Sequence, residues 1–230
     1  MRGPSNPGSL RNLPIRQLII YDLDGTLVDT RKDIVQAANQ MLKEMGASPL
    51  SEQEIIPTVG RGLRHLVGGC VKSEDPGRIE QGMKIYRAYY AQHLLDYSRL
   101  YPGAREVLEH FKGRKQAVVT NKPNPYSRDI LIGLGVADYF VEIIGGESEY
   151  PKKPAPEALI SLMEKNRARP METLFVGDSP IDIEAGRRAG VLTVVVSHGF
   201  AGTQEVAAAQ PDLVVDSFKD FLKLAVAHGW

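Results

Sequence analysis

A short apolar run that ends in two carboxylates constrains this chain more than any other stretch. Residues 18–21 read Leu-Ile-Ile-Tyr, and residues 22–26 read Asp-Leu-Asp-Gly-Thr. An apolar run without polar alternation is typical of a parallel strand buried on both faces. Ligands of open α/β sheets bind at the carboxyl ends of such strands. We therefore expect Asp22 and Asp24 to face one crevice, because side chains at positions i and i+2 of a strand point the same way.

Two carboxylates placed this way require a cation or a shared proton. Unit charges about 4 Å apart repel by about 1 kcal/mol in water and by about 4 kcal/mol at an effective dielectric of 20. A surface turn is the alternative interpretation, since Asp and Gly are common turn residues. However, Asp-x-Asp-Gly-Thr after a strand arises by composition at only about one position in 10⁵. The motif therefore favours a functional site.

Two blocks of different character follow the motif. Residues 30–100 have apolar side chains at helical spacing and predict helices over 33–45, from 52 and over 78–97. From residue 101 onward, helical segments alternate with apolar strands, which are expected at 116–121, 141–144, 173–176, 192–196 and 213–215. This alternation predicts an α/β fold, a three-layer Rossmann-like parallel sheet with helices on both faces.

The same pattern predicts the domain organisation. The core is expected to comprise residues 17–29 and 101–230, and the helical block 30–100 is an insert between the first strand and its partner. Residues 1–16, of which 1–14 are rich in Gly, Pro, Ser and Asn, are expected to form a flexible N-terminal tail.

Charge and cysteine content exclude several classes of protein. The chain has 230 residues, and its 28 Lys and Arg balance its 28 Asp and Glu, so nothing favours binding to nucleic acid or to an anionic membrane. The single cysteine, Cys70, excludes an internal disulfide and a cysteine-rich zinc site. No segment is long enough to span a bilayer, and the first 14 residues lack the apolar core of a signal peptide. We expect a cytoplasmic protein.

Further polar residues follow later strands or precede the helices between them. The residues concerned are Thr120, Asn121 and Lys122 after one strand, Lys153 in a loop, and Asp178 and Asp182 after another strand. Each group alone also fits a turn or a helix cap. Because the carboxyl ends of parallel strands share one edge, we expect the groups to converge. Carboxylates suit Mg²⁺, and lysine, hydroxyl and amide donors suit phosphate oxygens.

These motifs resemble those of the haloacid dehalogenase superfamily in its phosphatase form, from about residue 17 onward. Residues 22–29 are similar to the first motif of that superfamily, Thr120 to the second, Lys153 to the third and residues 177–182 to the fourth. The resemblance implies a Mg²⁺-dependent phosphomonoester hydrolase that forms an aspartyl-phosphate. The helical insert would be the mobile cap of that superfamily.

The resemblance also implies a role for each residue. Asp22 would be the nucleophile and Asp24 the general acid and base. The other implied roles are phosphoryl binding by Thr120, Asn121 and Lys153, metal binding by Asp22, Asp24 (through its backbone carbonyl) and Asp178, and ordering of the metal site by Asp182. Haloalkanoate dehalogenases lack the second carboxylate of the first motif, so we do not expect dehalogenation.

A loop of the insert is expected to set specificity. Two glycines, Gly60 and Gly62, flank Arg61, and they allow the backbone to approach a ligand closely. Arg61 is our candidate partner for a substrate carboxylate, and a surface hairpin with solvated arginines is the alternative.

The resemblance narrows to the bacterial phosphoglycolate phosphatase family. It rests on this loop together with residues 120–123, 145–146, 152–156, 175–179 and 211–215. Members of that family commonly carry a neutral residue between the glycines, so Arg61 departs from their pattern. The resemblance implies hydrolysis of 2-phosphoglycolate, a small phosphorylated metabolite. We expect the protein to be a monomer or a homodimer. A phosphatase for another small phosphate, a phosphoglucomutase-type phosphotransferase and a non-catalytic phosphate-binding regulator remain alternatives.

Overall fold

The core is a six-stranded parallel sheet with β1 (Leu18–Tyr21) near its centre. The computed structural model describes residues 15–230, and it places the strands in the order β5-β4-β1-β6-β7-β8. The other strands are β4 (Lys115–Val119), β5 (Glu142–Ile144), β6 (Thr173–Gly177), β7 (Leu192–Val196) and β8 (Leu213–Val215). Strand β1 is completely buried, since it pairs with β4 and β6 at its edges and packs against apolar clusters on both of its faces. The predicted α/β class is confirmed.

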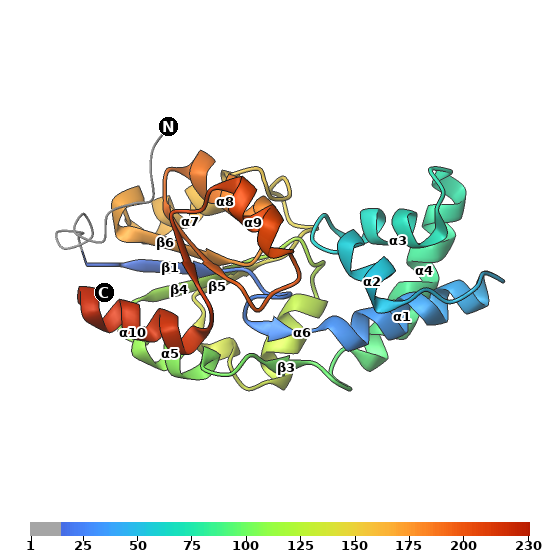
Figure 1. Cartoon of the computed structure of the whole chain (residues 1–230), viewed down its shortest axis with the longest axis horizontal. Helices are drawn as coiled ribbons and strands as arrows, with labels where there is room; N and C mark the ends of the chain where they lie inside the picture. The colour runs from blue at the N-terminus through green and yellow to red at the C-terminus, as the bar shows by residue number, and fades with distance from the viewer. Residues whose placement is uncertain (1–14) are drawn as a thin grey trace.

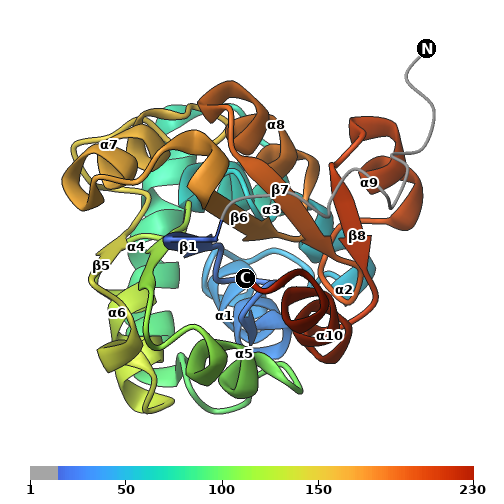
Figure 2. The same ribbon diagram turned by 90° about the vertical axis from the view of Figure 1, so that its left-hand side faces the viewer.

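Helices cover both faces of this sheet (Figures 1 and 2). One face carries α7 (Glu157–Asn166), α8 (Pro180–Ala189) and α9 (Thr203–Ala209), and the other carries α5 (Ala104–His110), α6 (Tyr126–Gly133) and α10 (Phe218–His228). Successive residues of β1 point to opposite faces of the sheet. Ile19 packs in the apolar cluster that contains Phe221, and Ile20 packs in the apolar cluster that contains Leu162. The period of two is that of a strand buried on both faces.

The helical insert lies beyond the carboxyl edge of the sheet, at the right of Figure 1. Its helices are α1 (Arg31–Glu44), α2 (Glu52–Ile55), α3 (Leu63–Val71) and α4 (Pro76–His93). A short 3-10 turn at Ile56–Thr58 follows α2. Two more 3-10 turns, Ala137–Tyr139 and Pro170–Glu172, lie in the core. The helix expected from residue 52 is a single turn that ends at Ile55, and Pro57 follows in the first 3-10 turn. The carboxylate of Glu54 accepts from the Ser51 N–H at 2.9 Å, which is one half of a capping box at the start of this helix.

The chain enters and leaves the insert through one antiparallel pair of strands, β2 (Val28–Asp29) and β3 (Arg99–Leu100). The buried carboxylate of Asp33 fixes the returning chain, because it accepts hydrogen bonds from the backbone N–H groups of Tyr97 and Ser98. Entry and exit are therefore held side by side.

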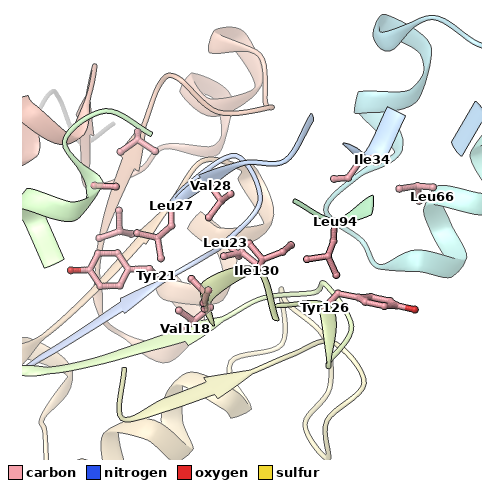
Figure 3. Packing of buried hydrophobic residues seen from close by; sticks show 14 of the residues in the cluster. Tyr21, Leu23, Leu27, Val28, Ile34, Leu66, Leu94, Val118, Tyr126 and Ile130 are labelled. Carbon is pink, nitrogen blue, oxygen red and sulfur yellow. The ribbon is translucent and has the colours of Figure 1, made fainter. Parts of the chain in front are cut away.

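One apolar cluster runs from the sheet into the insert (Figure 3). It includes Tyr21 and Val118 of the sheet, Leu23 just beyond β1, and Ile34 and Leu66 of the insert. Leu23 is completely buried in this cluster. Since it occupies the core, its neighbours on either side are left to face the opposite way, toward the edge of the sheet.

The residues that precede β1 are only partly described. Arg16 is 1 % exposed, and its guanidinium lies 4.8 Å above the ring of Trp230. Residues 1–14 of the predicted tail lie outside the described part of the chain. Within residues 15–230, no helix combines the length and the apolar character needed to cross a membrane.

Candidate active site

Three carboxylates meet where β1 and β6 end. Asp22, Asp178 and Asp182 each offer one oxygen atom within 4.8 Å of the others. They are 8 %, 3 % and 2 % exposed. The two strands are paired in parallel with Tyr21 opposite Val176, so the residues that follow them emerge at the same edge. The loops therefore converge as the sequence predicts.

Lys153 lies among these carboxylates. Its Nζ is 2.7 Å from Oδ1 of Asp22 and 2.7 Å from Oδ1 of Asp182. Burial alone would lower the pKa of Lys153, but attraction to Asp182 and Asp22 outweighs it and raises the pKa above its usual value. Lys153 is therefore a buried cation that offsets only part of the negative charge.

Asp182 belongs to the first turn of α8 and holds that turn in place. Its Oδ2 accepts from the hydroxyl of Ser179 at 2.6 Å and from the backbone N–H groups of Ser179 and Asp178 at 3.2 and 3.3 Å. A carboxylate in this position is stabilised by the free N–H groups and the positive end of the helix. Asp182 thus positions Lys153 and the backbone of Asp178 together.

Asp178 occupies a cradle that admits no additional side chain. Its Oδ2 accepts from the backbone N–H of Phe200 at 2.6 Å, and its Oδ1 accepts from the Thr26 hydroxyl at 3.3 Å. A Cβ atom built on Gly25 or on Gly199 would lie 2.3 Å from Oδ2. Gly25 also has a φ of +79°, which other residues rarely adopt. Both positions therefore require glycine.

The shared burial of these carboxylates disfavours their ionisation. Burial raises the pKa of Asp22 to about 6, although Lys153 opposes the shift and Asp182 adds to it. Burial, with repulsion from Asp182 and Asp22, raises the pKa of Asp178 well above its usual value. A divalent cation would relieve this repulsion, and carboxylate oxygens are the ligands that Mg²⁺ prefers. The donor set therefore fits a metal ion.

Asp24 faces a different set of partners. Its carboxylate accepts from the Thr30 hydroxyl at 2.6 Å and from Nζ of Lys122 at 3.0 and 3.2 Å. Lys122 is itself buried, and its Nζ lies 4.6 Å from the ring centre of Tyr90 in α4. From the sequence, Lys122 is expected in the strand-end cluster as one of the lysines that suit phosphate oxygens. In the structure its Nζ pairs instead with the carboxylate of Asp24.

Thr120 and Asn121 follow β4 at the same edge. The Thr120 oxygen accepts from the Lys122 N–H at 3.2 Å, and its own proton has no acceptor within residues 15–230. The side chain of Asn121 donates to the carbonyl oxygens of Gly60 and Lys153 at 2.8 and 2.9 Å, and its Oδ1 accepts from the Lys153 N–H at 2.9 Å. Both N–H donors of its amide are therefore used within the protein.

A cavity of about 320 Å³ lies between the insert and the carboxyl edge of the sheet, and every site residue predicted from the sequence lines it. The loop Gly60–Gly62 forms part of its wall, where Gly60 and Gly62 have φ values of +101° and +93°. Arg61 reaches this wall while its side chain remains exposed. Ile34, Leu63, Leu66 and Tyr86 contribute an apolar wall. The cavity therefore offers a charged end and an apolar end.

Residues 19–196 match the family described as haloacid dehalogenase-like hydrolase. The chain belongs to this family, so the resemblance seen in the sequence is confirmed. It is 37% identical to the phosphoglycolate phosphatase of Vibrio parahaemolyticus over 219 residues, which are 90% of this chain and 95% of that protein. It is 34% identical to the phosphoglycolate phosphatase of Pectobacterium atrosepticum, over 90% of this chain and 91% of that protein.

A solved structure extends this similarity to the fold. The crystal structure of a predicted phosphoglycolate phosphatase from Haemophilus somnus 129pt superimposes with a TM-score of 0.87 at 34% identity. The match covers 91% of this chain and 98% of that chain. The chain is a phosphoric monoester hydrolase with the fold of the haloacid dehalogenase-like phosphatases.

Proposed function

We propose that this protein hydrolyses 2-phosphoglycolate to glycolate and phosphate, with Mg²⁺ as cofactor and an aspartyl-phosphate on Asp22 as intermediate. The observation that carries the proposal is the contact of Asp22 with Lys153 beside Asp178 in a cavity covered by the insert. Relatives that are 34% and 37% identical over nine-tenths of the chain bear the name phosphoglycolate phosphatase. Their name supports the choice of substrate.

In the first half of the reaction, a carboxylate oxygen of Asp22 attacks phosphorus, and the bond from phosphorus to the glycolate oxygen breaks. Asp24 donates its proton to the departing oxygen. In the second half, Asp24 takes a proton from water as that water attacks the phosphorus of the aspartyl-phosphate. The bond from phosphorus to the Asp22 oxygen breaks, which releases phosphate and restores the Asp22 carboxylate. General acid and base catalysis of this kind contributes about 10² to 10⁴-fold.

Charge and position explain why an anionic carboxylate can approach an anionic phosphate. Nζ of Lys153 lies 2.7 Å from Oδ1 of Asp22, and its positive charge offsets the repulsion between this carboxylate and the phosphate. The Thr120 hydroxyl and the backbone N–H of Asn121, neither of which donates a hydrogen bond within residues 15–230, would receive the phosphoryl oxygens. Phosphoryl transfer depends mainly on such positioning and electrostatic stabilisation.

Asp22, the Asp24 backbone carbonyl and Asp178 would hold the metal ion. When bound, Mg²⁺ would supply positive charge to the carboxylates and the phosphoryl oxygens. Asp182 would order this group through Lys153 and the Asp178 N–H, which it contacts at 2.7 and 3.3 Å.

Arg61 supplies the element of specificity in this proposal. It lines the same cavity as the catalytic carboxylates, and an arginine fits a carboxylate through paired N–H donors. The substrate would then lie with its phosphate toward Lys153 and its carboxylate toward the Gly60–Gly62 loop.

The decisive experiment is a rate table over about twenty phosphate esters, with Mg²⁺ and with chelator. We expect 2-phosphoglycolate to give the highest kcat/KM and chelation to abolish phosphate release. A sugar phosphate, nucleotide or pyrophosphate that ranks far above it would replace the substrate assignment. Isomer conversion with little free phosphate would indicate a phosphotransferase, and no turnover of any ester would indicate a phosphate-binding regulator. Cytoplasmic location and a monomeric or homodimeric state remain predictions.

A further inference from the structure

The side chain of Asn121 lies where the insert meets the core. Its amide forms hydrogen bonds with two backbone segments, one in the insert and one in the core. The Gly60 carbonyl belongs to the insert, and the N–H and carbonyl groups of Lys153 belong to the core loop that carries the buried ammonium. Asn121 is 4 % exposed, so these partners replace water completely.

The three hydrogen bonds use both donors of the amide and one lone pair of its oxygen. Both N–H groups of a primary amide donate, to Gly60 at 2.8 Å and to Lys153 at 2.9 Å, and its oxygen accepts from the Lys153 N–H at 2.9 Å. The opposite orientation of the amide would place an oxygen against two carbonyl oxygens, so the bonding pattern fixes the orientation. No side-chain donor remains for a phosphoryl oxygen.

The backbone at this position is held as firmly as the side chain. A Cβ atom built on Gly146 would lie 2.2 Å from the carbonyl oxygen of Asn121, and the Gly146 N–H donates to the Lys122 carbonyl at 2.9 Å. The loop after β4 therefore packs directly against the backbone of Gly146. The side chain of Asn121 therefore extends from a fixed base.

The Gly60 carbonyl is oriented toward Asn121 by a loop with unusual backbone angles. Gly60 has a φ of +101°, and Gly62, with a φ of +93°, lies against Lys152, where an added Cβ would be 3.0 Å from Cε. Lys152 directly precedes Lys153. The same short core segment is therefore contacted twice by the insert loop, once through Asn121 and once through Gly62.

We propose that Asn121 is a positioning residue that couples docking of the Gly60–Gly62 loop to the placement of Lys153. When the loop is docked, Gly60 occupies the second N–H of the amide and the pairing with the Lys153 backbone is fixed. When the loop moves away, that N–H loses its partner and the amide is free to rotate, so the Lys153 backbone loses a matched pair of hydrogen bonds. The ammonium is then correctly placed only under a docked loop.

This inference rests on the proposed function, because it concerns the lysine that we assign to the phosphoryl group. Its consequence is that the charge needed for transfer is assembled when the cavity is covered. An uncovered site, open to water, would hold its lysine less well.

The test compares Asn121→Ala with Asn39→Ala. Asn39 is a matched control because its amide also pairs with backbone in both directions, with the N–H and carbonyl of Leu50 at 2.8 and 2.9 Å, but entirely inside the insert. Hydrogen exchange is measured at the N–H groups of Val59 and His65, which are bonded to the carbonyls of Ile56 and Gly62 on either side of the loop. Kcat and KM for 2-phosphoglycolate and the Kd for inorganic phosphate are measured with Mg²⁺.

We expect N121A to raise exchange at both amides by about tenfold, the effect of one lost hydrogen bond, and to lower kcat by about tenfold or more with a smaller change in KM. N39A should change these quantities by less than about twofold while lowering Tm. Asn121→Ser, whose shorter side chain does not reach Gly60, should raise exchange in the same direction and serves if N121A does not fold.

Unchanged exchange at Val59 and His65 in the Asn121 variants would overturn the inference. If the Kd for phosphate then rises, Asn121 is a direct phosphate ligand and not a coupling residue. Failure of the proposed function has a different signature. The wild-type protein would not hydrolyse 2-phosphoglycolate, whereas the exchange experiment would still report whether Asn121 holds the loop.

Discussion

Nζ of Lys122 lies 3.0 and 3.2 Å from the two carboxylate oxygens of Asp24. This pair is largely buried, with the two side chains 5% and 13% exposed. The Nζ of Lys122 also lies over the ring of Tyr90. This core cation is therefore held between Asp24, the proposed general acid and base, and helix α4 of the insert. Lys122 therefore fixes the direction in which Asp24 faces.

Replacing Lys122 should impair catalysis without removing any catalytic group. We expect Lys122→Met to lower kcat by about 10 to 100-fold, because small displacements of a catalytic side chain have effects of this size. Lys115→Met is the control, since Lys115 is exposed at the opposite end of β4. Steady-state kinetics and thermal melts of both variants provide the measurement, and a K122M enzyme with wild-type kcat would contradict the assignment.

Asp24→Asn should retain the fold and lose most of the activity. The oxygen of an asparagine can still accept from Thr30 and Lys122, and only the second contact of Lys122, to Oδ2, is lost. It cannot donate and accept the transferred proton, and we expect kcat to fall by about 10² to 10⁴-fold. Phosphate release measured under single-turnover conditions would check this, and a loss below fivefold would assign the proton transfer elsewhere.

Asp22→Asn should abolish turnover, because a neutral amide oxygen is a poor nucleophile toward phosphorus. The expected result is no Mg²⁺-dependent phosphate release above background from any ester that the wild-type protein cleaves. Hydrolysis at the wild-type rate would exclude the covalent mechanism. The folded state of the variant is verified by its thermal melt.

The stability of the metal-free protein should depend on pH through Asp22. Burial raises its pKa to about 6, although Lys153 opposes the shift. In the unfolded chain the pKa is about 3.9. Between these values the folded protein binds more protons than the unfolded chain, so this group makes the free energy of unfolding fall as pH rises from about 4 to about 6.

The Asp22→Asn variant lacks this contribution. With chelator present, its free energy of unfolding should exceed that of the wild-type protein by more at pH 7.5 than at pH 4.5. Added Mg²⁺ should raise the Tm of the wild-type protein at pH 7.5 and have less effect on the variant. Denaturant titrations at the two pH values give the answer. A difference between the proteins that is independent of pH would place the raised pKa elsewhere.

Arg61→Ala should affect substrates that carry a carboxylate. We expect KM for 2-phosphoglycolate to rise about five- to tenfold, as for loss of one charge-assisted contact, with little change for an aryl phosphate. Arg64→Ala is the matched control, because Arg64 is exposed and pairs with Glu80 at 3.2 Å. An unchanged KM for 2-phosphoglycolate in R61A would remove Arg61 from the proposal.

The strand-end residues were predictable because order along the chain determines where they emerge in a parallel sheet. Asp22, Thr120 and Asp178 each follow a buried apolar run, and parallel pairing brings those ends to one edge. The insert was predictable from helical spacing, although its second helix ends after one turn, where Pro57 follows.

Pairing between distant side chains was not predictable. Lys122 and Asp24 are 98 positions apart, and either lysine of the site could have met either carboxylate of the first motif. The direction of the Asn121 amide depends on the Gly60 carbonyl, whose position is set by packing of the whole insert. Such contacts depend on tertiary packing, so local sequence patterns do not predict them.

The antiparallel pair of β2 and β3 has a mechanical consequence. It is the stem through which the chain enters and leaves the insert, and Thr30 is the first residue beyond it. The Thr30 hydroxyl is also a partner of Asp24, at 2.6 Å. If the insert swung about this stem, the hydroxyl that steadies the proposed proton donor would turn with it. Access to the chamber and readiness of the acid would then change in one movement.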